Sequence, residues 1–213
     1  MIDAHDTNKS ESSFESDNAF RTAFAKILGT TPMSFSSDAS LQASWFHTPL
    51  GAMIAVSDQR CLHLLEFSDR KALPTELRRL CPSIAPTGFD NRFAVGFGKP
   101  PPAEQVEAEL NDYFRLRSDV FNVSLAMHGT AFTRSVWCEL QAIPAGKTCS
   151  YSDVALAVGR PAAVRAVARA NGANQIAIVI PCHRVIGADG SLTGYGGGLW
   201  RKQKLIELER QFL

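Results

Sequence analysis

Residues 180–185 read Ile180-Pro181-Cys182-His183-Arg184-Val185, a cysteine followed by a histidine and an arginine at the end of an apolar run. Positive charge beside a cysteine can favour its thiolate, which is the nucleophilic form. A thiolate in such a setting can carry out covalent chemistry. We therefore predict that Cys182 is a reactive nucleophile. The alternative that stays open is a buried structural thiol, which is what most free cysteines are.

The residues around Cys182 make two other kinds of site less attractive. A metal site would need two ligands beyond Cys182 and His183, and no nearby spacing supplies them. A cysteine protease usually draws its histidine from a distant part of the chain. A histidine that takes a proton from a thiol is helped by a carboxylate. Spacing alone does not choose among the three acidic residues downstream, which are Asp189, Glu207 and Glu209.

The composition is that of an ordinary globular protein, because 45% of the 213 residues are hydrophobic and 20% are charged. The longest apolar run, around 176–180, is too short for a membrane span. The polar start at 1–15 lacks the features of a secretory signal. The five cysteines, at positions 61, 81, 138, 149 and 182, include no C-x-x-C pair. We therefore expect a protein of the reducing cytosol with no disulfide framework and no membrane partner.

Charge is divided unevenly along the chain. Residues 1–129 carry 12 Lys and Arg against 16 Asp and Glu, whereas residues 130–213 carry 10 against 5. The basic C-terminal part can attract a polyanion such as DNA. The alternative is a solvated basic surface without a nucleic-acid partner.

The first 128 residues have the pattern of a small α/β domain preceded by a helix. That first helix is expected within 14–35, with Ser16 or Asp17 as its cap and Gly29 at its end, and a linker follows at 36–44. An antiparallel meander comes next. The other expected elements are strands at 44–48, 52–57, 61–67 and 120–126, and helices at 70–80 and 103–115.

The C-terminal part is mainly helical, with helices expected at 132–141, 151–158, 161–170 and 199–212. The second and third, joined through Gly159, fit a helix-turn-helix. No acidic residue occurs between Asp153 and Asp189, while Arg165 and Arg169 lie on the third helix. This favours DNA over a plain helical pair. A buried extended run at 176–181 then leads to Cys182, and a glycine-rich loop follows at 187–198.

At this point the chain resembles the O6-alkylguanine-DNA alkyltransferases, also called methylated-DNA–protein-cysteine methyltransferases. The resemblance covers about 129–211, including the terminal helix, and is looser over 41–128. The blocks that carry it, in chain order, are Phe132-Thr133-Arg134-Ser135-Val136-Trp137, Ile143-Pro144-Ala145-Gly146-Lys147-Thr148, Ser150-Tyr151, Ala163-Val164-Arg165-Ala166-Val167, Asn174, Pro181-Cys182-His183-Arg184-Val185 and Gly194-Tyr195.

The resemblance implies a catalytic set. Cys182 would accept the alkyl group, and His183 would form the thiolate by acting as a base through a water molecule. Glu209 would hold that histidine. Asn174 would brace the active-site turn by side-chain hydrogen bonds. Tyr151 would hydrogen-bond the flipped guanine and donate a proton as the base leaves.

The resemblance also implies residues that contact the base and the DNA. The carbonyls of Cys182 and Val185 would accept from the exocyclic amine of guanine, and Tyr195 with Gly196 would line the pocket near the guanine oxygen. Arg165 would enter the duplex where the base left, and its helix would lie in the minor groove. Small residues on that helix would permit close approach to the DNA backbone, namely Ala162, Ala163, Ala166 and Ala170.

The domain organisation implied by the resemblance has three parts. Residues 1–40 would be a polar tail with a truncated helix-turn-helix remnant, because 14–35 resembles the end of an AraC-like domain as found in Ada-like proteins. A chance amphipathic helix is the alternative for that segment. Residues 41–128 would be an RNase H-like α/β domain with an antiparallel sheet. Residues 129–213 would be a winged-helix-like domain that binds DNA and carries the active site.

Three departures from the family pattern bear on affinity and on the range of alkyl groups. The run Gly196-Gly197-Gly198 could loosen the pocket wall. Ala162 stands where a lysine is common, which removes one phosphate contact. Asn171 and Gly172 could shorten the docking helix.

The function expected from these observations is DNA repair by irreversible transfer of the alkyl group from O6-alkylguanine in double-stranded DNA, and also from O4-alkylthymine if that base is accepted, to Cys182. A thioether is stable and nothing in the sequence regenerates the thiolate, so each molecule would react once. We expect a monomer at the nucleoid, with no metal, small-molecule or other cofactor. The alternatives are a non-covalent damage-recognition protein, a transcriptional regulator acting through 14–35, and a thiol hydrolase of small esters.

Overall fold

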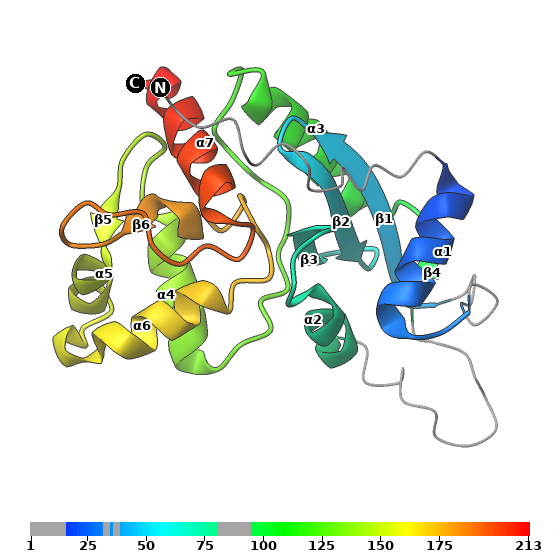
Figure 1. The fold of residues 1–213 in the computed structure, drawn as a ribbon, viewed down its shortest axis with the longest axis horizontal. Coiled ribbons are helices and arrows are strands. Elements are labelled where there is room, and N and C mark those ends of the chain that lie inside the picture. The colour runs from blue at the N-terminus through cyan, green and yellow to red at the C-terminus, as the bar shows by residue number, and fades with distance from the viewer. Residues whose placement is uncertain (1–15, 32–34, 36–38, 81–94) are drawn as a thin grey trace, which may run out of the picture.

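The computed structural model describes residues 16–31, 35, 39–80 and 95–213 (Figure 1). The polar start at 1–15 and Cys81 lie outside these residues, as do 32–34 of the expected helical segment and 36–38 of the expected linker. None of the helices in the described ranges is long and apolar enough to cross a lipid bilayer.

Four strands of the described chain form one sheet in the order β3-β2-β1-β4. The predicted meander is confirmed: β1 (Leu41–Thr48) pairs antiparallel with β2 (Gly51–Ser57), which pairs antiparallel with β3 (Leu62–Phe67). The fourth strand, β4 (Val95–Phe97), was not predicted, and it lies parallel to β1. β3 is therefore the sheet edge nearest the C-terminal helices, and Figure 1 shows it facing them.

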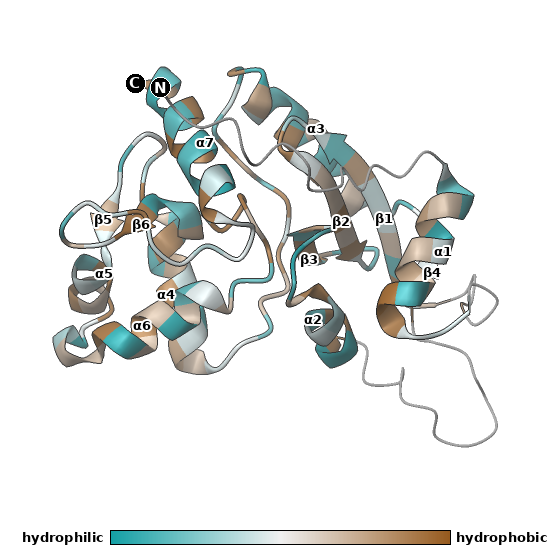
Figure 2. Cartoon of the chain, viewed as in Figure 1, coloured by the Kyte–Doolittle hydropathy of each residue, from teal (hydrophilic) through white to brown (hydrophobic). Residues whose placement is uncertain are grey.

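Both faces of the sheet are covered, as the near-continuous apolar sequence of β2 requires. Met53 and Ala55 face a core shared with α3 (Pro101–Phe114) and the C-terminal part. Ile54 and Val56 face a second core with α1 (Asp17–Leu28) and α2 (Leu73–Leu80). Successive side chains of a strand point to opposite faces, so β2 serves both cores. Figure 2 shows this strand among the most hydrophobic parts of the molecule.

The first helix begins and ends where the sequence predicts. The Ser16 hydroxyl accepts a hydrogen bond from the Ala19 amide at 3.2 Å, and Gly29 ends the helix with φ 74°. Phe20, Phe24 and Leu28 are buried against the sheet. α1 is therefore an integral layer of the α/β part.

The helical C-terminal part packs against the same sheet (Figure 1). It begins with α4, whose buried face is Val136, Trp137 and Leu140 as predicted, with Phe132 half-buried. The Trp137 indole donates to the Ala170 carbonyl at 2.9 Å and joins α4 to α6. The elements in order are α4 (Ala131–Gln141), β5 (Cys149–Ser150), α5 (Tyr151–Ala157), a 3₁₀ turn (Pro161–Ala163), α6 (Val164–Gly172), a 3₁₀ turn (Cys182–Arg184), β6 (Val185–Ile186), α7 (Leu199–Glu209) and a final 3₁₀ turn (Arg210–Phe212).

Three expectations about local structure are wrong. The strand expected at 120–126 is no strand, because in that segment only an isolated bridge joins Leu125 to Leu62. The run at 176–181 is buried but forms turns, with Ile178 at φ 70°. Asn171 and Gly172 belong to α6 and do not shorten it.

Candidate active site and DNA-docking surface

Cys182 opens a 3₁₀ turn that the preceding buried residues hold in place. Its thiol accepts a hydrogen bond from the Asn174 amide nitrogen at 3.2 Å. The same nitrogen donates to the Ile180 carbonyl at 2.8 Å, and the Asn174 amide oxygen accepts from the Ile176 amide at 3.0 Å. Asn174 thus ties both ends of the segment before the cysteine, in line with the bracing role expected for it.

The β3 edge of the sheet supports this segment as well. The Leu65 amide donates to the Gln175 carbonyl at 2.8 Å, and the Ala177 amide donates back to the Leu65 carbonyl at 2.7 Å. Ile178 follows with a left-handed backbone, which is costly for a β-branched residue. The N-terminal sheet therefore fixes the path of the chain into the active-site turn.

In the structure, burial outweighs the effect of positive charge on the Cys182 thiol. Only 5% of Cys182 is exposed, and burial raises the pKa of its thiol to about 11 despite the Asn174 hydrogen bond and the charges of Arg70 and Lys202. Arg184 does not supply the expected stabilisation, because its guanidinium points to Glu209 and the Ile143 carbonyl. The thiol is protonated at rest and needs a base.

His183 is placed to be that base. Its Nε2 lies 2.7 Å from a carboxylate oxygen of Glu209, and its Nδ1 is buried with no hydrogen-bond partner among the described residues. Burial lowers the pKa of His183, so the ring is neutral at pH 7. A carboxylate at Nε2 favours the tautomer whose Nδ1 accepts a proton.

Among the acidic residues that spacing left open, Glu209 is the one that meets the histidine. Glu207 and Asp189 make local hydrogen bonds at the surface, to Gln203 and Ser191 respectively. The expectation from family resemblance thus agrees with the geometry.

Glu209 is also the centre of a buried polar network. Arg184 donates to its two oxygens at 2.8 and 2.9 Å, Tyr113 donates at 2.8 Å, and the Gly146 amide donates at 3.3 Å. Burial alone would raise the pKa of Glu209, but the bonds from His183 and Arg184 hold this pKa well below its ordinary value. The carboxylate therefore stays charged and orients the histidine.

Lys202 belongs to the site but was not singled out from the sequence. Its ammonium donates to the carbonyls of Val185 and Thr193, each at 2.5 Å. Burial lowers the pKa of Lys202 to about 8. Its position in a basic amphipathic helix gave no signal, because such lysines are usually solvated. The Val185 carbonyl, expected to accept from guanine, already accepts from this ammonium.

The glycine-rich loop at 187–198 contacts Tyr151 through Thr193 and places the Tyr195 ring near His183. The Tyr151 hydroxyl donates to the Thr193 carbonyl at 3.4 Å. The Tyr195 ring lies edge-on to His183 with centroids 6.4 Å apart, and its hydroxyl is buried without a partner in the described part of the chain. Gly196 follows on the exposed side. The structure thus places Tyr151 against the loop that carries Tyr195 and Gly196.

The predicted docking helix presents a basic outer face. Arg165, Ala166 and Arg169 are exposed and Ala163 is half-buried. Ala170 departs from the expected set of small docking residues, because it is buried under Trp137.

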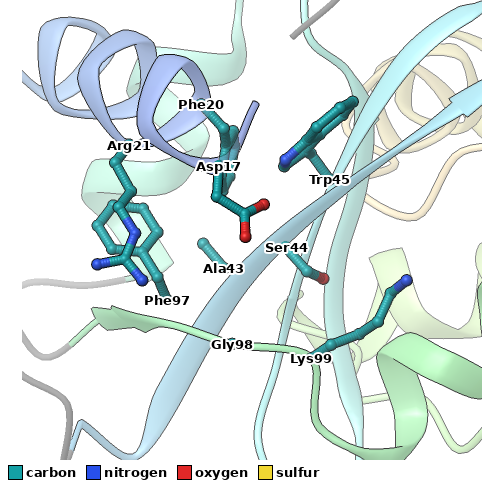
Figure 3. A pocket seen from close by; sticks show the side chains of 9 residues that line it. All are labelled: Asp17, Phe20, Arg21, Ala43, Ser44, Trp45, Phe97, Gly98 and Lys99. Atoms are coloured by element: carbon teal, nitrogen blue, oxygen red, sulfur yellow. The ribbon is translucent and has the colours of Figure 1, made fainter. Parts of the chain in front are cut away.

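A cavity of about 290 Å³ lies elsewhere, between α1, β1 and β4 (Figure 3). It contains none of the predicted site residues. Its lining consists of Asp17, Phe20, Arg21, Ala43, Ser44, Trp45, Phe97, Gly98 and Lys99.

Comparison with known proteins supports the family resemblance noted in the sequence. Residues 131–211 match the family described as 6-O-methylguanine DNA methyltransferase, DNA binding domain. A protein of Mycolicibacterium paratuberculosis named methylated-DNA–protein-cysteine methyltransferase is 46% identical over 149 residues, which is 70% of this chain and 87% of that protein.

Solved structures agree with this result. The Mycobacterium tuberculosis O6-methylguanine methyltransferase superposes with a TM-score of 0.67 at 35% identity, covering 81% of this chain and 94% of the other. The M. tuberculosis OGT in complex with DNA gives a TM-score of 0.65 at 35% identity, with 81% and 93% covered. The chain belongs to the family of methylated-DNA–protein-cysteine methyltransferases.

Proposed function

We propose that this protein repairs DNA by moving the alkyl group of O6-alkylguanine onto Cys182. The observation that carries the proposal is that Cys182, His183 and Glu209 are all buried, and that a neutral imidazole held by the Glu209 carboxylate follows a protonated thiol directly in the chain. O4-alkylthymine is a second candidate substrate.

In the proposed reaction His183 accepts the Cys182 proton through a bridging water molecule. The sulfur attacks the alkyl carbon, an S–C bond forms, and the bond between that carbon and O6 breaks. Tyr151 donates a proton to the departing guanine, and the proton that His183 took up returns to Tyr151 through solvent. The products are a thioether on Cys182 and an intact guanine, so the protein is consumed by one transfer.

A guanine inside a duplex cannot reach a sulfur that is only 5% exposed. We therefore propose that the base is flipped out, which costs least where alkylation has already weakened pairing. α6 would lie in the minor groove with Arg165 in the space left by the base. The exposed basic face of α6 fits sequence-independent contact with phosphates.

We also propose that residues 41–128 act as a scaffold and that 129–213 carry out DNA binding and chemistry. The protein works as a monomer on cytosolic, nucleoid-associated DNA. The support for a scaffold role is that β3 holds the segment leading to Cys182. The origin of 14–35 as an AraC-like remnant stays a prediction.

The proposal is tested by the mass of the intact protein after incubation with a duplex containing O6-methylguanine. We expect a gain of one methyl group, located on Cys182, and no gain for Cys182→Ala. Lesion binding with no transfer, unchanged in Cys182→Ala, would instead indicate a damage-recognition protein. Release of many product molecules per protein from a small ester would indicate a hydrolase.

A further inference from the structure

Arg70 is a buried arginine of the N-terminal part that two carboxylates hold in one orientation. It lies between β3 and α2 and is 8% exposed. One arm of its guanidinium, Nη1, donates to Glu66, and the other, Nη2, donates to Glu76 at 2.7 Å. A guanidinium fixed from both arms loses the freedom of an ordinary surface arginine.

The same guanidinium also touches two elements of the proposed DNA site. Its Nη2 donates to the carbonyl of Gly172, the last residue of α6, at 3.3 Å. It also lies directly against Gly196. A Cβ atom placed on Gly196 would be 2.5 Å from Nη1 and 2.7 Å from Cζ of Arg70. Arg70 therefore occupies the space that any side chain at position 196 would need.

The run of three glycines is packed against residues of the N-terminal part. Alone, Gly196-Gly197-Gly198 would loosen the pocket wall. In the structure Arg70 backs Gly196, and a Cβ on Gly197 would be 2.9 Å from the Phe67 ring. The absence of a side chain at Gly196 and Gly197 lets the loop approach Arg70 and Phe67 of the N-terminal part closely, although a Cβ on Gly197 would also meet the Tyr195 ring of the same loop at 2.8 Å.

Arg70 is also near the reacting groups. Tyr195, the residue before Gly196, lies edge-on to His183. The positive charge of Arg70 opposes the rise in the pKa of Cys182 that burial causes. A displacement of the guanidinium would therefore allow Gly196 and the adjacent Tyr195, which form the wall of the proposed base pocket, to move.

We propose that Arg70 is a positioning residue for alkyl transfer, which fixes the Tyr195–Gly196 wall from behind and ties it to the end of α6. The proposal rests on the transfer function proposed above. Arg70 does not touch the alkyl group in this scheme; it acts through Gly196 and Gly172.

The test is a double-mutant cycle of Gly196→Ala and Arg70→Lys in the full chain. Lysine keeps a cation between Glu66 and Glu76 but lacks the planar fork that abuts Gly196. Three quantities are measured: the single-turnover transfer rate constant at saturating O6-methylguanine duplex, the affinity for undamaged duplex, and the Tm.

Gly196→Ala is expected to lower the transfer rate constant about tenfold or more when Arg70 is present, since small misplacements at a reacting site are costly. In the Arg70→Lys chain the same change should cost less than about threefold, because the clash is gone. Affinity for undamaged duplex should stay the same throughout. If Gly196→Ala lowers the transfer rate constant by the same factor in the wild-type and Arg70→Lys chains, the proposal is overturned.

A matched control is Asp69→Asn. It weakens another ion pair between the N-terminal and C-terminal parts, Arg201 with Asp69 at 2.9 and 3.0 Å, and leaves Arg70 against Gly196. Arg201 also donates to the carbonyl of Gly197 at 2.8 Å, so this variant shows whether loss of any ion pair beside the loop slows transfer. We expect it to transfer like the wild type; a loss equal to that of Arg70→Lys would overturn the specific role of Arg70.

If Gly196→Ala does not fold, Arg70→Lys alone decides the question. It should lower the transfer rate constant about threefold or more with unchanged affinity for undamaged DNA, and a wild-type rate would overturn the proposal. A wild-type chain that gains no methyl group would overturn the transfer function, and this inference with it. A reactive wild type with an additive cycle overturns this inference alone.

Discussion

Cys182 and His183 are both neutral at pH 7, and burial is the largest cause in both cases. Before reaction, Cys182 and His183 therefore do not form a thiolate–imidazolium pair. With a thiol pKa of about 11, forming the thiolate at pH 7 without help costs about 5 kcal/mol. A base that accepts the proton as the S–C bond forms avoids a large part of this cost, and the carboxylate of Glu209 steadies the cation that results.

His183→Ala should therefore change the pH profile of transfer as well as its rate. Burial lowers the pKa of His183 below its ordinary value of 6.5, so in the wild type the rate should still be flat at pH 6.5 and should fall only at lower pH. The variant should be about 10²- to 10⁴-fold slower at pH 7. Its rate should then rise about tenfold per pH unit toward the thiol pKa. Single-turnover rates between pH 6 and 10 measure both profiles.

The control for this variant is His63→Ala, which removes an imidazole that contacts Asp58 and His128 instead of Glu209. It should keep the wild-type profile. A flat profile for His183→Ala would show that another group removes the proton.

At the residue scale the sequence was sufficient to propose Cys182, His183 and a set of acids that includes Glu209, the residue whose carboxylate meets His183 in the structure. It was insufficient for the state of the thiol, because that state depends on burial and on where Arg184 points. Adjacent residues in a sequence can direct their side chains away from each other, and here Arg184 serves the carboxylate. Lys202 was missed for a related reason: a lysine's burial is decided by tertiary packing.

Among the elements, α6 combines a buried face that fixes it to α4 with an exposed basic face that we propose contacts DNA. Val167 and Ala170 are buried, whereas Arg165 and Arg169 are exposed on the other side. The two arginines are expected to differ in role. Arg169 is suited to a phosphate contact, and Arg165 to filling the space of the flipped base.

This difference can be measured with two alanine variants. Arg169→Ala should weaken binding to undamaged duplex and reduce the slope of log K against log salt by about 1. Arg165→Ala should slow transfer from a duplex but leave transfer from the free base O6-benzylguanine unchanged, because a free base needs no flipping. Equal losses on both substrates for Arg165→Ala would contradict its proposed role and indicate damage to the site itself.

Local sequence pattern predicted the elements whose signals are local. The caps of α1, the meander and the buried face of α4 all followed from residue spacing. β4 did not, because three residues in a loop rich in Pro, Gly and Phe become a strand only by pairing with distant β1. The alternation at 120–126 predicted a strand that does not form, because a strand needs a partner along its length and this segment makes only one isolated bridge.

In the whole molecule one sheet serves two cores, and its β3 edge guides the chain toward Cys182. One core is shared with α3 and the C-terminal part, and the other holds α1 and α2. The ion pair of Arg201 with Asp69 and the contacts of Arg70 also join the N-terminal α/β part to the C-terminal part. Such long-range pairings leave no periodic signature, which is why the sequence indicated the chemistry of the site but not how the scaffold supports it.

The packing of α1 leads to a prediction about the N-terminal segment. Phe24 is fully buried among Phe20, Phe97 and the sheet. Phe24→Ala should therefore lower the free energy of unfolding by about 3–4 kcal/mol. Lys26→Ala, on the exposed side of the same helix, should change it by less than about 0.5 kcal/mol. Urea unfolding measures both.

The transfer rate of folded Phe24→Ala should match the wild type, because the helix covers the sheet face opposite to the core that contains Cys182. A vestigial helix that merely rests on the surface would give no stability loss in this variant. Substantial loss of stability with normal transfer would show that the segment, whatever its origin, now serves as a structural layer of the α/β part.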